Sequence, residues 1–202
     1  MNGKDKDFIK IIDFMKEIEK FKLVERKILL SSLRRYENDA EHSWHLAVFL
    51  VLMKDYLPKR ANFQRMVKLA LIHDLGELYV GDVSLFDTNG REGKDKRELD
   101  SAKKLFAKLP KKLGKEMMDL FMEYMEAKTK EAKIVKSLDK IQATIQYNSS
   151  KSKNMRKMGL TYKIVDDKKR PYMDHDKNML KIYELAMLEA KKKGLFASSK
   201  KN

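Results

Sequence analysis

The sequence predicts an all-α protein, and three observations support this fold class. Residues that end helices are rare, because the 202 residues include only three prolines and eight glycines. The segments between them are rich in Lys, Glu, Leu, Met and Ala, which are good helix formers. Within these segments apolar residues recur every three or four positions, as they do along one face of an amphipathic helix. We therefore expect a bundle of helices.

Apolar spacing and a capping pattern predict the first two helices. The first should cover residues 7–22, where the apolar positions at helical spacing are Phe8, Ile11, Ile12, Met15 and Ile18. Asn38 followed three residues later by Glu41 is typical of a capping box, which predicts a second helix over residues 39–56. The middle of this second helix is apolar on all sides, so we expect it to be central, with Trp44 in the core.

The remaining elements follow in chain order. A third helix is predicted from Asn62 to the neighbourhood of His73, and residues 81–94 should form a loop. Apolar positions at helical spacing predict further helices at 96–109, 113–127, 130–147 and 177–193. Residues 149–176 are polar and should form a long connection, and both chain ends should be frayed. Neither a repeat nor a sharp change in composition divides the chain, so we expect one domain over residues 1–202.

The composition excludes several classes of protein and site. The absence of cysteine excludes disulfides, iron–sulfur clusters, thiolate zinc sites and cysteine nucleophiles. The longest apolar run, residues 46–53, is too short for the roughly 20 residues that span a bilayer. The charged N-terminus lacks the apolar region of a secretory signal. We therefore expect a cytoplasmic protein that has no membrane partner.

The net charge of +15 favours anionic partners. Lysine supplies most of this charge, and solvated lysines on helix faces explain it more simply than a nucleic-acid groove, since specific readout relies on arginine. We therefore expect a small phosphate ester, such as a nucleotide, ahead of a nucleic acid.

Histidine is scarce, and its placement is informative. Three of the four histidines lie in two short clusters, Glu41 to His45 and His73 to Glu77. The first cluster begins the apolar helix and the second ends the next one, so an antiparallel helix pair would bring His42 and His73 together. On residue types alone, a metal site and a histidine that merely caps a helix are about equally good interpretations.

Asp139 is the best candidate for a further oxygen ligand. It stands beside the apolar stripe of the helix at 130–147, where a carboxylate is costly without a partner. Two imidazoles and two carboxylates suit Mn, Fe, Co, Ni or Zn better than Ca, and they leave positions for water and substrate.

Taken together, these motifs resemble those of the HD-domain metal-dependent phosphohydrolases, and within them the 5'-deoxynucleotidase branch. The resemblance covers residues 20–147, and we expect this range to be the core of the domain, followed by the helix at 177–193. The matching strings keep the order and spacing of the family, and they are Glu37-Asn-Asp-Ala-Glu-His42-Ser-Trp44, Ala70-Leu-Ile-His73-Asp74-Leu-Gly-Glu77, Gly81-Asp82, Phe121-Met-Glu-Tyr-Met-Glu-Ala-Lys-Thr-Lys-Glu-Ala132 and Val135-Lys-Ser-Leu-Asp139-Lys-Ile-Gln-Ala143.

This resemblance implies a role for each matching residue. Four of them would bind one divalent metal ion between the central helices, with Mn, Co, Fe, Ni, Zn or Mg as the candidates, and these ligands are His42, His73, Asp74 and Asp139. Glu77 matches the catalytic glutamate that positions or deprotonates the attacking water. Asp82 matches a second functional acid, which touches the leaving oxygen or the sugar. His45 would support the site without being a ligand.

Cations that contact phosphate are expected upstream of the first histidine. Lys27 falls where the resemblance places the phosphate-contacting arginine, and Arg34 and Arg35 lie closer to His42. The family pattern has Arg-Trp where this chain has Lys27 followed by Ile28, so the two-pronged arginine contact and the aromatic residue are both missing. This departure puts discrimination against ribonucleotides in doubt.

The resemblance implies a homodimeric enzyme that hydrolyses a (deoxy)nucleoside 5'-monophosphate to nucleoside and phosphate. Two other interpretations remain open. One keeps the metal site but changes the substrate to a nucleoside triphosphate or a guanosine alarmone. In the other, the chain is a basic nucleic-acid-binding module whose HD site is vestigial, which the lysine excess and the departure at residues 27–28 would favour.

Overall fold

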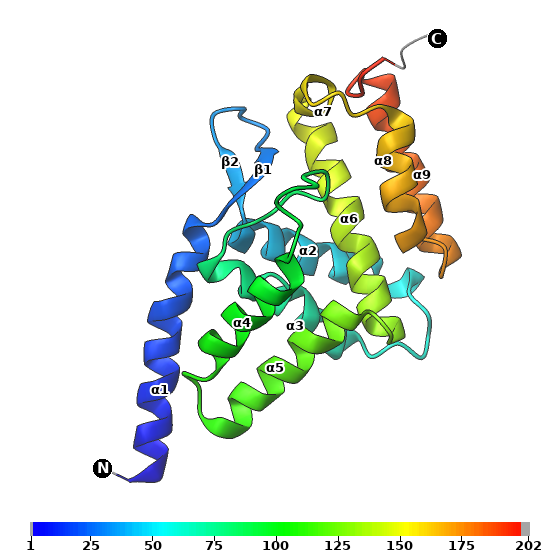
Figure 1. Ribbon diagram of the computed structural model, residues 1–202. Helices are drawn as coiled ribbons and strands as arrows, with labels where there is room; N and C mark the ends of the chain where they lie inside the picture. The colour runs from blue at the N-terminus through cyan, green and yellow to red at the C-terminus, as the bar shows by residue number, and fades with distance from the viewer. Residues whose placement is uncertain (1, 199–202) are drawn as a thin grey trace.

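The computed structural model describes residues 2–198 and confirms the all-α prediction (Figure 1). Its helices are α1 Gly3–Ile18, α2 Asp39–Met53, α3 Phe63–Ile72, α4 Lys94–Phe106, α5 Lys111–Glu126, α6 Lys130–Ser150, α7 Asn154–Lys157, α8 Tyr162–Lys169 and α9 Lys177–Lys192. Short 3-10 turns cover Glu19–Leu23, Lys54–Tyr56, Leu75–Tyr79 and Arg170–Tyr172. Within the described residues, no helix is long and apolar enough to cross a bilayer.

The α6 helix is the centre of the fold. It has 21 residues and lies between α2, α3 and α5 on one side and α8 and α9 on the other (Figure 1). Its apolar stripe is fully buried and consists of Ile134, Val135, Leu138 and Ile141. Because the site residues of α2 and α3 face this helix, its packing decides how the site is assembled.

The α2 helix begins at the predicted residue because its capping box is formed. The Asn38 side chain accepts a hydrogen bond from the Glu41 amide at 2.9 Å, and the Glu41 carboxylate accepts one from the Asn38 amide at 3.1 Å. The expectation that Trp44 is a core residue is wrong, since 66% of it is exposed. Leu52 is 71% exposed, so α2 buries one face against α6 and leaves an apolar face open.

The α3 helix ends where the second histidine cluster begins. Its last residue is Ile72, His73 caps its C-terminus, and the chain then tightens into the 3-10 turn at Leu75–Tyr79. Gly76 lets this turn approach α5 closely, because a Cβ atom there would lie 2.7 Å from the Phe121 ring. The turn therefore holds residues 74–77 against the core.

A small β-hairpin, which was not predicted, connects the first two helices. Strands β1 Glu25–Leu29 and β2 Tyr36–Asn38 are antiparallel, and β1 packs on α6. The segment is short and mixes charged and apolar residues, so its period-two pattern is weak in the sequence. This hairpin matters because it brings Arg26 to the site.

Two predicted segments differ in the structure. The connection at 149–176 contains α7 and α8, because Thr161 caps α8 and Met155 and Val165 are buried. The first helix starts at Gly3 instead of residue 7, since Asn2 forms a capping box with Asp5. The predicted frayed ends fall partly on residues 1 and 199–202, which lie outside the described residues.

Candidate metal centre and cavity

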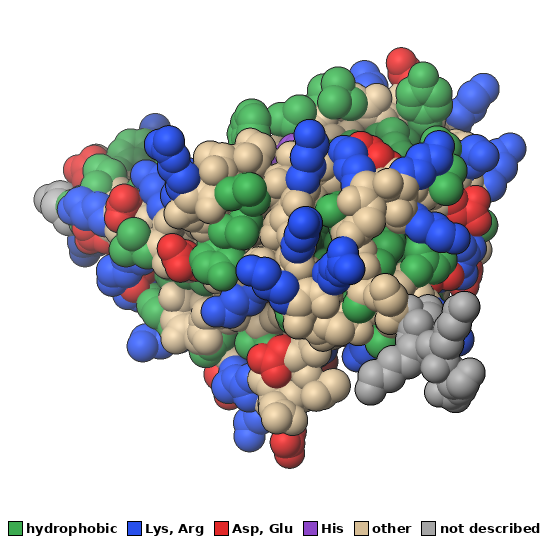
Figure 2. All heavy atoms as spheres, turned by 90° about the horizontal axis from the view of Figure 1, so that it is seen from above, with side chains coloured by type: hydrophobic (Ala, Val, Ile, Leu, Met, Phe, Trp, Pro, Cys, Tyr) green, Lys and Arg blue, Asp and Glu red, His purple; other side chains and the backbone are tan. Residues whose placement is uncertain are grey.

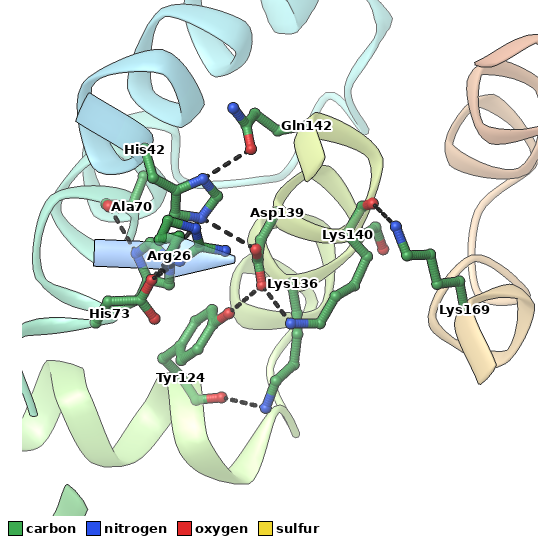
Figure 3. A network of polar contacts seen from close by, with 12 residues as sticks. Arg26, His42, Ala70, His73, Tyr124, Lys136, Asp139, Lys140, Gln142 and Lys169 are labelled. Carbon is green, nitrogen blue, oxygen red and sulfur yellow. Dashed lines mark hydrogen bonds and ion pairs between the residues drawn. The ribbon is translucent and has the colours of Figure 1, made fainter. Parts of the chain in front are cut away.

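Four predicted ligands from three separate segments meet beside α6. His42 from α2 has its Nε2 atom 3.1 Å from Oδ1 of Asp139 on α6 (Figure 3). The same nitrogen lies 3.8 Å from Oδ2 of Asp74. His73 has its Nε2 atom 3.0 Å from the same oxygen of Asp74. The two imidazole rings lie 5.2 Å apart between centroids. The structure thus gathers all four side chains around one small space.

A glutamine fixes the orientation of the His42 ring. The Nδ1 atom of His42 lies 2.7 Å from the Oε1 atom of Gln142, which is one turn along α6 from Asp139. The amide nitrogen of Gln142 donates to Glu37 at 3.1 Å and lies 2.9 Å from Nδ1 of His45. Because Oε1 of Gln142 can only accept, Nδ1 of His42 carries the proton and Nε2 presents a lone pair to Asp139.

A backbone carbonyl fixes the His73 ring in the same sense. Its Nδ1 atom lies 2.9 Å from the carbonyl oxygen of Ala70, which accepts the proton of that nitrogen. The buried Nε2 atom makes no hydrogen bond within the described residues, although it faces the Asp74 carboxylate. A lone pair that faces a carboxylate is repelled unless a cation lies between them.

The donor set therefore fits a divalent metal ion. Ligand atoms of His42, His73 and Asp139 lie within 4.8 Å of one another, and Asp74 contacts both imidazoles. Each histidine is held through its other ring nitrogen, as is usual for metal ligands. Mixed nitrogen and oxygen ligands suit Mn, Fe, Co, Ni and Zn.

Burial and neighbouring charges keep two of these groups in the protonation states that bind metals. Burial, helped by the charge of Arg26, lowers the pKa of His42 to about 4, so this imidazole is neutral. Burial alone would raise the pKa of Asp139, but the attraction of nearby positive charge, above all that of Lys140, outweighs it and keeps that pKa below its ordinary value. A neutral imidazole therefore faces an ionised carboxylate.

Arg26, which was not predicted, lies at the centre of the acidic residues. Its guanidinium lies 2.9 Å from Asp74, 3.4 Å from Asp39 and 3.5 Å from Glu37. Lys27, the predicted phosphate contact, also borders the cavity but its side chain is exposed. Adjacent residues of a strand point to opposite faces, so an error of one residue in counting back from His42 is enough to select the wrong cation.

Glu77 and Asp82 form a second acidic cluster with Asp39. Glu77 is 4% exposed, and burial together with the charge of Asp74 raises its pKa. The ammonium of Lys94, from the start of α4, lies 2.8 Å from the Glu77 carboxylate. Lys94 was not predicted, because nothing in its local sequence distinguishes it from the many surface lysines.

A cavity of about 280 Å³ borders both clusters. Its walls come from β1, α4, α5, α6, α8, the 3-10 turn at 75–79 and the loop after Asp82. Its cationic lining consists of Arg26, Lys27, Arg91, Lys94, Lys136, Lys140 and Lys169. This mixture of acidic and basic walls suits an anionic ligand that binds beside a metal ion.

The structure does not bring Arg34 and Arg35 to this cavity. Both are exposed near the hairpin turn, and Arg35 forms an ion pair with Glu41, with one N–O distance of 2.9 Å. Neither side chain lines the cavity. More broadly, Figure 2 shows Lys and Arg side chains scattered over the face seen from above, among hydrophobic and neutral ones.

Residues 18–180 match the HD domain family. The human 5'-deoxynucleotidase HDDC2 is 33% identical over 139 residues, which are 69% of this chain and 64% of that protein. The 5'-deoxynucleotidase YBR242W of Saccharomyces cerevisiae is 31% identical over 141 residues, 67% of this chain and 58% of its own length. The chain thus matches less than two thirds of either relative.

One solved structure is similar over nearly the whole chain. A protein described as a predicted metal-dependent phosphohydrolase from Magnetospirillum magnetotacticum MS-1 superposes with a TM-score of 0.86 at 30% identity. The match covers 95% of this chain and 99% of the other.

Proposed function

The chain belongs to the HD domain family, and from this premise we propose that it is a metal-dependent phosphohydrolase that cleaves (deoxy)nucleoside 5'-monophosphates to nucleoside and phosphate. Metal dependence is a property of HD phosphohydrolases. The choice of a 5'-monophosphate rests on the printed names of the curated relatives, which are 5'-deoxynucleotidases.

One observation carries the proposal. His42 and His73 each have Nδ1 occupied by an acceptor of this chain, and each turns Nε2 toward a carboxylate, at 3.1 Å for His42 and 3.0 Å for His73. A purely structural histidine has no need of this arrangement, which leaves two lone pairs facing negative charge. We propose that His42, His73, Asp74 and Asp139 hold one divalent ion.

When bound, such an ion lowers the pKa of water and neutralises charge on phosphoryl oxygens. The protein supplies the remaining chemistry. We propose that Glu77 accepts a proton from the water that attacks phosphorus, and that Lys94 holds the Glu77 carboxylate in place through the 2.8 Å contact. Asp82 would give a proton to the 5' oxygen as the bond between phosphorus and that oxygen breaks.

For substrate binding, Arg26 and Lys27 border the cavity and are the better candidates for phosphate contacts. Arg26 already has three carboxylate neighbours, so its main effect is to neutralise the acidic cluster next to the substrate. We assign no substrate contact to Arg34 or Arg35, because both lie outside the cavity lining.

The proposal extends to assembly and location. A homodimer is supported by the exposed apolar face of α2, which includes Trp44 and Leu52. Light scattering during gel filtration should give twice the mass of one chain, and a monomer at micromolar concentration would contradict this part. A cytoplasmic location is proposed because the proposed substrates, nucleotides, are found mainly inside cells.

Phosphate release from a panel of ribo- and deoxyribonucleoside mono- and triphosphates tests the proposal. Chelator-treated protein resupplied with Mn, Co, Mg or Zn should release phosphate from monophosphates only when metal is added. Release from triphosphates alone would show that the substrate is a nucleoside triphosphate and not a monophosphate. Salt-sensitive binding of nucleic acid, with no hydrolysis, would favour the binding-module interpretation.

A further inference from the structure

Three lysines form one wall of the cavity. Lys136 and Lys140 lie four residues apart on α6, and Lys169 reaches toward them from the end of α8 (Figure 3). All three line the cavity. Lys140 connects this wall to the proposed metal ligands, because its ammonium is 2.7 Å from Oδ2 of Asp139. We call these three residues the lysine wall.

Two of the three lysines in the wall form no ion pair with a carboxylate of the described residues. Lys136 donates hydrogen bonds to the carbonyls of Tyr124 and Met125, at 3.1 and 3.2 Å. Lys169 donates to the carbonyl of Lys140 at 3.0 Å and to the Thr144 hydroxyl at 2.8 Å. Among residues 2–198, no carboxylate lies within ion-pair distance of either ammonium.

Several acidic groups in and beside the cavity already contact other cations. Asp74 and Asp39 contact Arg26, and Glu77 contacts Lys94. Asp139 is the one carboxylate that contacts the lysine wall in the described part of the chain, and it also faces His42. A metal ion at the proposed site would also bind the Asp139 carboxylate. Lys136 and Lys169 have no carboxylate of residues 2–198 within ion-pair distance, so an anionic ligand could balance their charge.

Lys169 is the most informative member of the wall because it is 3% exposed. Burying an ammonium away from any carboxylate is costly. Burial and the repulsion of Lys140 lower the pKa of Lys169 to about 7. An ammonium has three donors, and two of them bond to the protein, so one remains for a ligand in the cavity.

We propose that the lysine wall is an anion subsite that binds phosphoryl oxygens beside Asp139, and that α8 supplies its decisive residue, Lys169. The assignment of the phosphate to a nucleotide rests on the proposed function, whereas the anion subsite itself does not. It adds to the site a residue that lies beyond the HD motifs in the sequence.

A purely structural role for Lys169 makes a different prediction. In that case its two hydrogen bonds only tie α8 to α6, so its replacement would lower stability and leave phosphate affinity unchanged. Affinity for a small anion in folded protein therefore separates the two roles.

Isothermal titration with inorganic phosphate at low salt and about pH 6 is the test, carried out on manganese-supplied protein. Lys169→Gln should raise the dissociation constant about tenfold or more, as expected for a lost charged contact in a buried site. Lys168→Gln is the matched control, because it removes the same charge from the preceding residue of α8, which is exposed. It should change the dissociation constant less than about twofold.

Folded Lys169→Gln protein that binds phosphate as the wild type does would overturn the subsite. If that variant fails to fold, Lys136→Gln decides, with weaker binding supporting the subsite and unchanged binding overturning it. Failure of the proposed function looks different. Phosphate binding would still depend on Lys169, while no nucleotide would be hydrolysed.

Discussion

At the scale of single residues, Glu77 carries the proton transfer in the proposed reaction. Glu77→Gln keeps the size and burial of the side chain but removes its basicity. We expect kcat to fall about 100- to 10,000-fold, the usual range for a lost general base, while bound metal stays unchanged. Steady-state kinetics and elemental analysis measure the two effects.

Glu92→Gln is a suitable control for this substitution, since Glu92 is an exposed residue of the nearby loop. It should leave kcat unchanged. A Glu77→Gln enzyme that retains its kcat would remove Glu77 from the mechanism.

Gln142 is expected to act through His42. Gln142→Ala removes the acceptor that fixes the His42 tautomer, so metal affinity should fall about 10- to 100-fold. Gln146→Ala removes another buried glutamine of α6, whose partner is the Leu29 carbonyl and not a histidine, and should leave the affinity unchanged. Competition with a chelating dye measures both variants, and equal losses in the two would show a general effect of packing.

Some residues of the candidate site could be predicted from the sequence and others could not. His42, His73, Asp74 and Asp139 stood out because histidine is scarce and the motifs keep a recognisable spacing. Gln142 lies three residues after Asp139, a helical spacing that could have suggested its position. Arg26 could not be separated from Lys27 without the strand that decides which of the two faces inward.

At the scale of elements, the 3-10 turn at 75–79 depends on close contact with α5. Gly76→Ala would place a Cβ atom 2.7 Å from the Phe121 ring and 3.0 Å from the Glu98 carbonyl oxygen. We expect the free energy of unfolding to fall by about 1–3 kcal/mol, the usual cost of overpacking. Urea denaturation measures this change.

Gly3→Ala is the control for that prediction, because a Cβ atom at Gly3 would meet nothing within 4 Å. It should change stability by less than about 0.5 kcal/mol. Equal stability of the two variants would contradict the packing account of the turn.

The anchoring of α1 should depend on pH. Glu17 accepts a hydrogen bond from the Tyr79 hydroxyl at 2.7 Å, and this bond, with that of Lys20, lowers its pKa to about 2 from the ordinary 4.5. The folded pKa lies below the unfolded one, so the stabilisation is complete above about pH 4.5 and is lost as the pH falls toward 2.

Hydrogen exchange of the α1 amides in wild-type and Glu17→Gln protein checks this prediction. The variant should be less protected at about pH 6, and the difference from wild type should shrink at about pH 3. A difference that is the same at both values would show that ionised Glu17 does not anchor α1.

Helix positions were easier to predict than the elements between them. Capping and periodicity located α2 and α3 closely, because Asn38 and Asn62 cap them and their apolar faces are regular. The polar composition of 149–176 hid α8, whose short helix depends on the Thr161 cap and the buried Val165. Tertiary packing decides such short elements more than local preference does.

At the scale of the whole molecule, the net charge is positive, but the region around the proposed metal ligands is acidic. The chain carries +15 overall, yet Glu37, Asp39, Asp74, Glu77 and Asp82 crowd around one end of the cavity. Composition predicts an anionic ligand but not this local reversal. Only the fold shows that an acidic centre suited to a cation adjoins a basic wall suited to a phosphate.

The central claim is that one metal ion, held by His42, His73, Asp74 and Asp139, is required for phosphate-ester hydrolysis. The most direct measurement titrates chelator-treated protein with Mn²⁺ and records bound manganese and phosphate release from deoxyadenosine monophosphate in the same samples. We predict that the rate rises in proportion to bound metal up to one ion per chain, and that His73→Ala shows neither binding nor turnover. Hydrolysis at full rate without metal, or turnover retained in His73→Ala, would contradict the account.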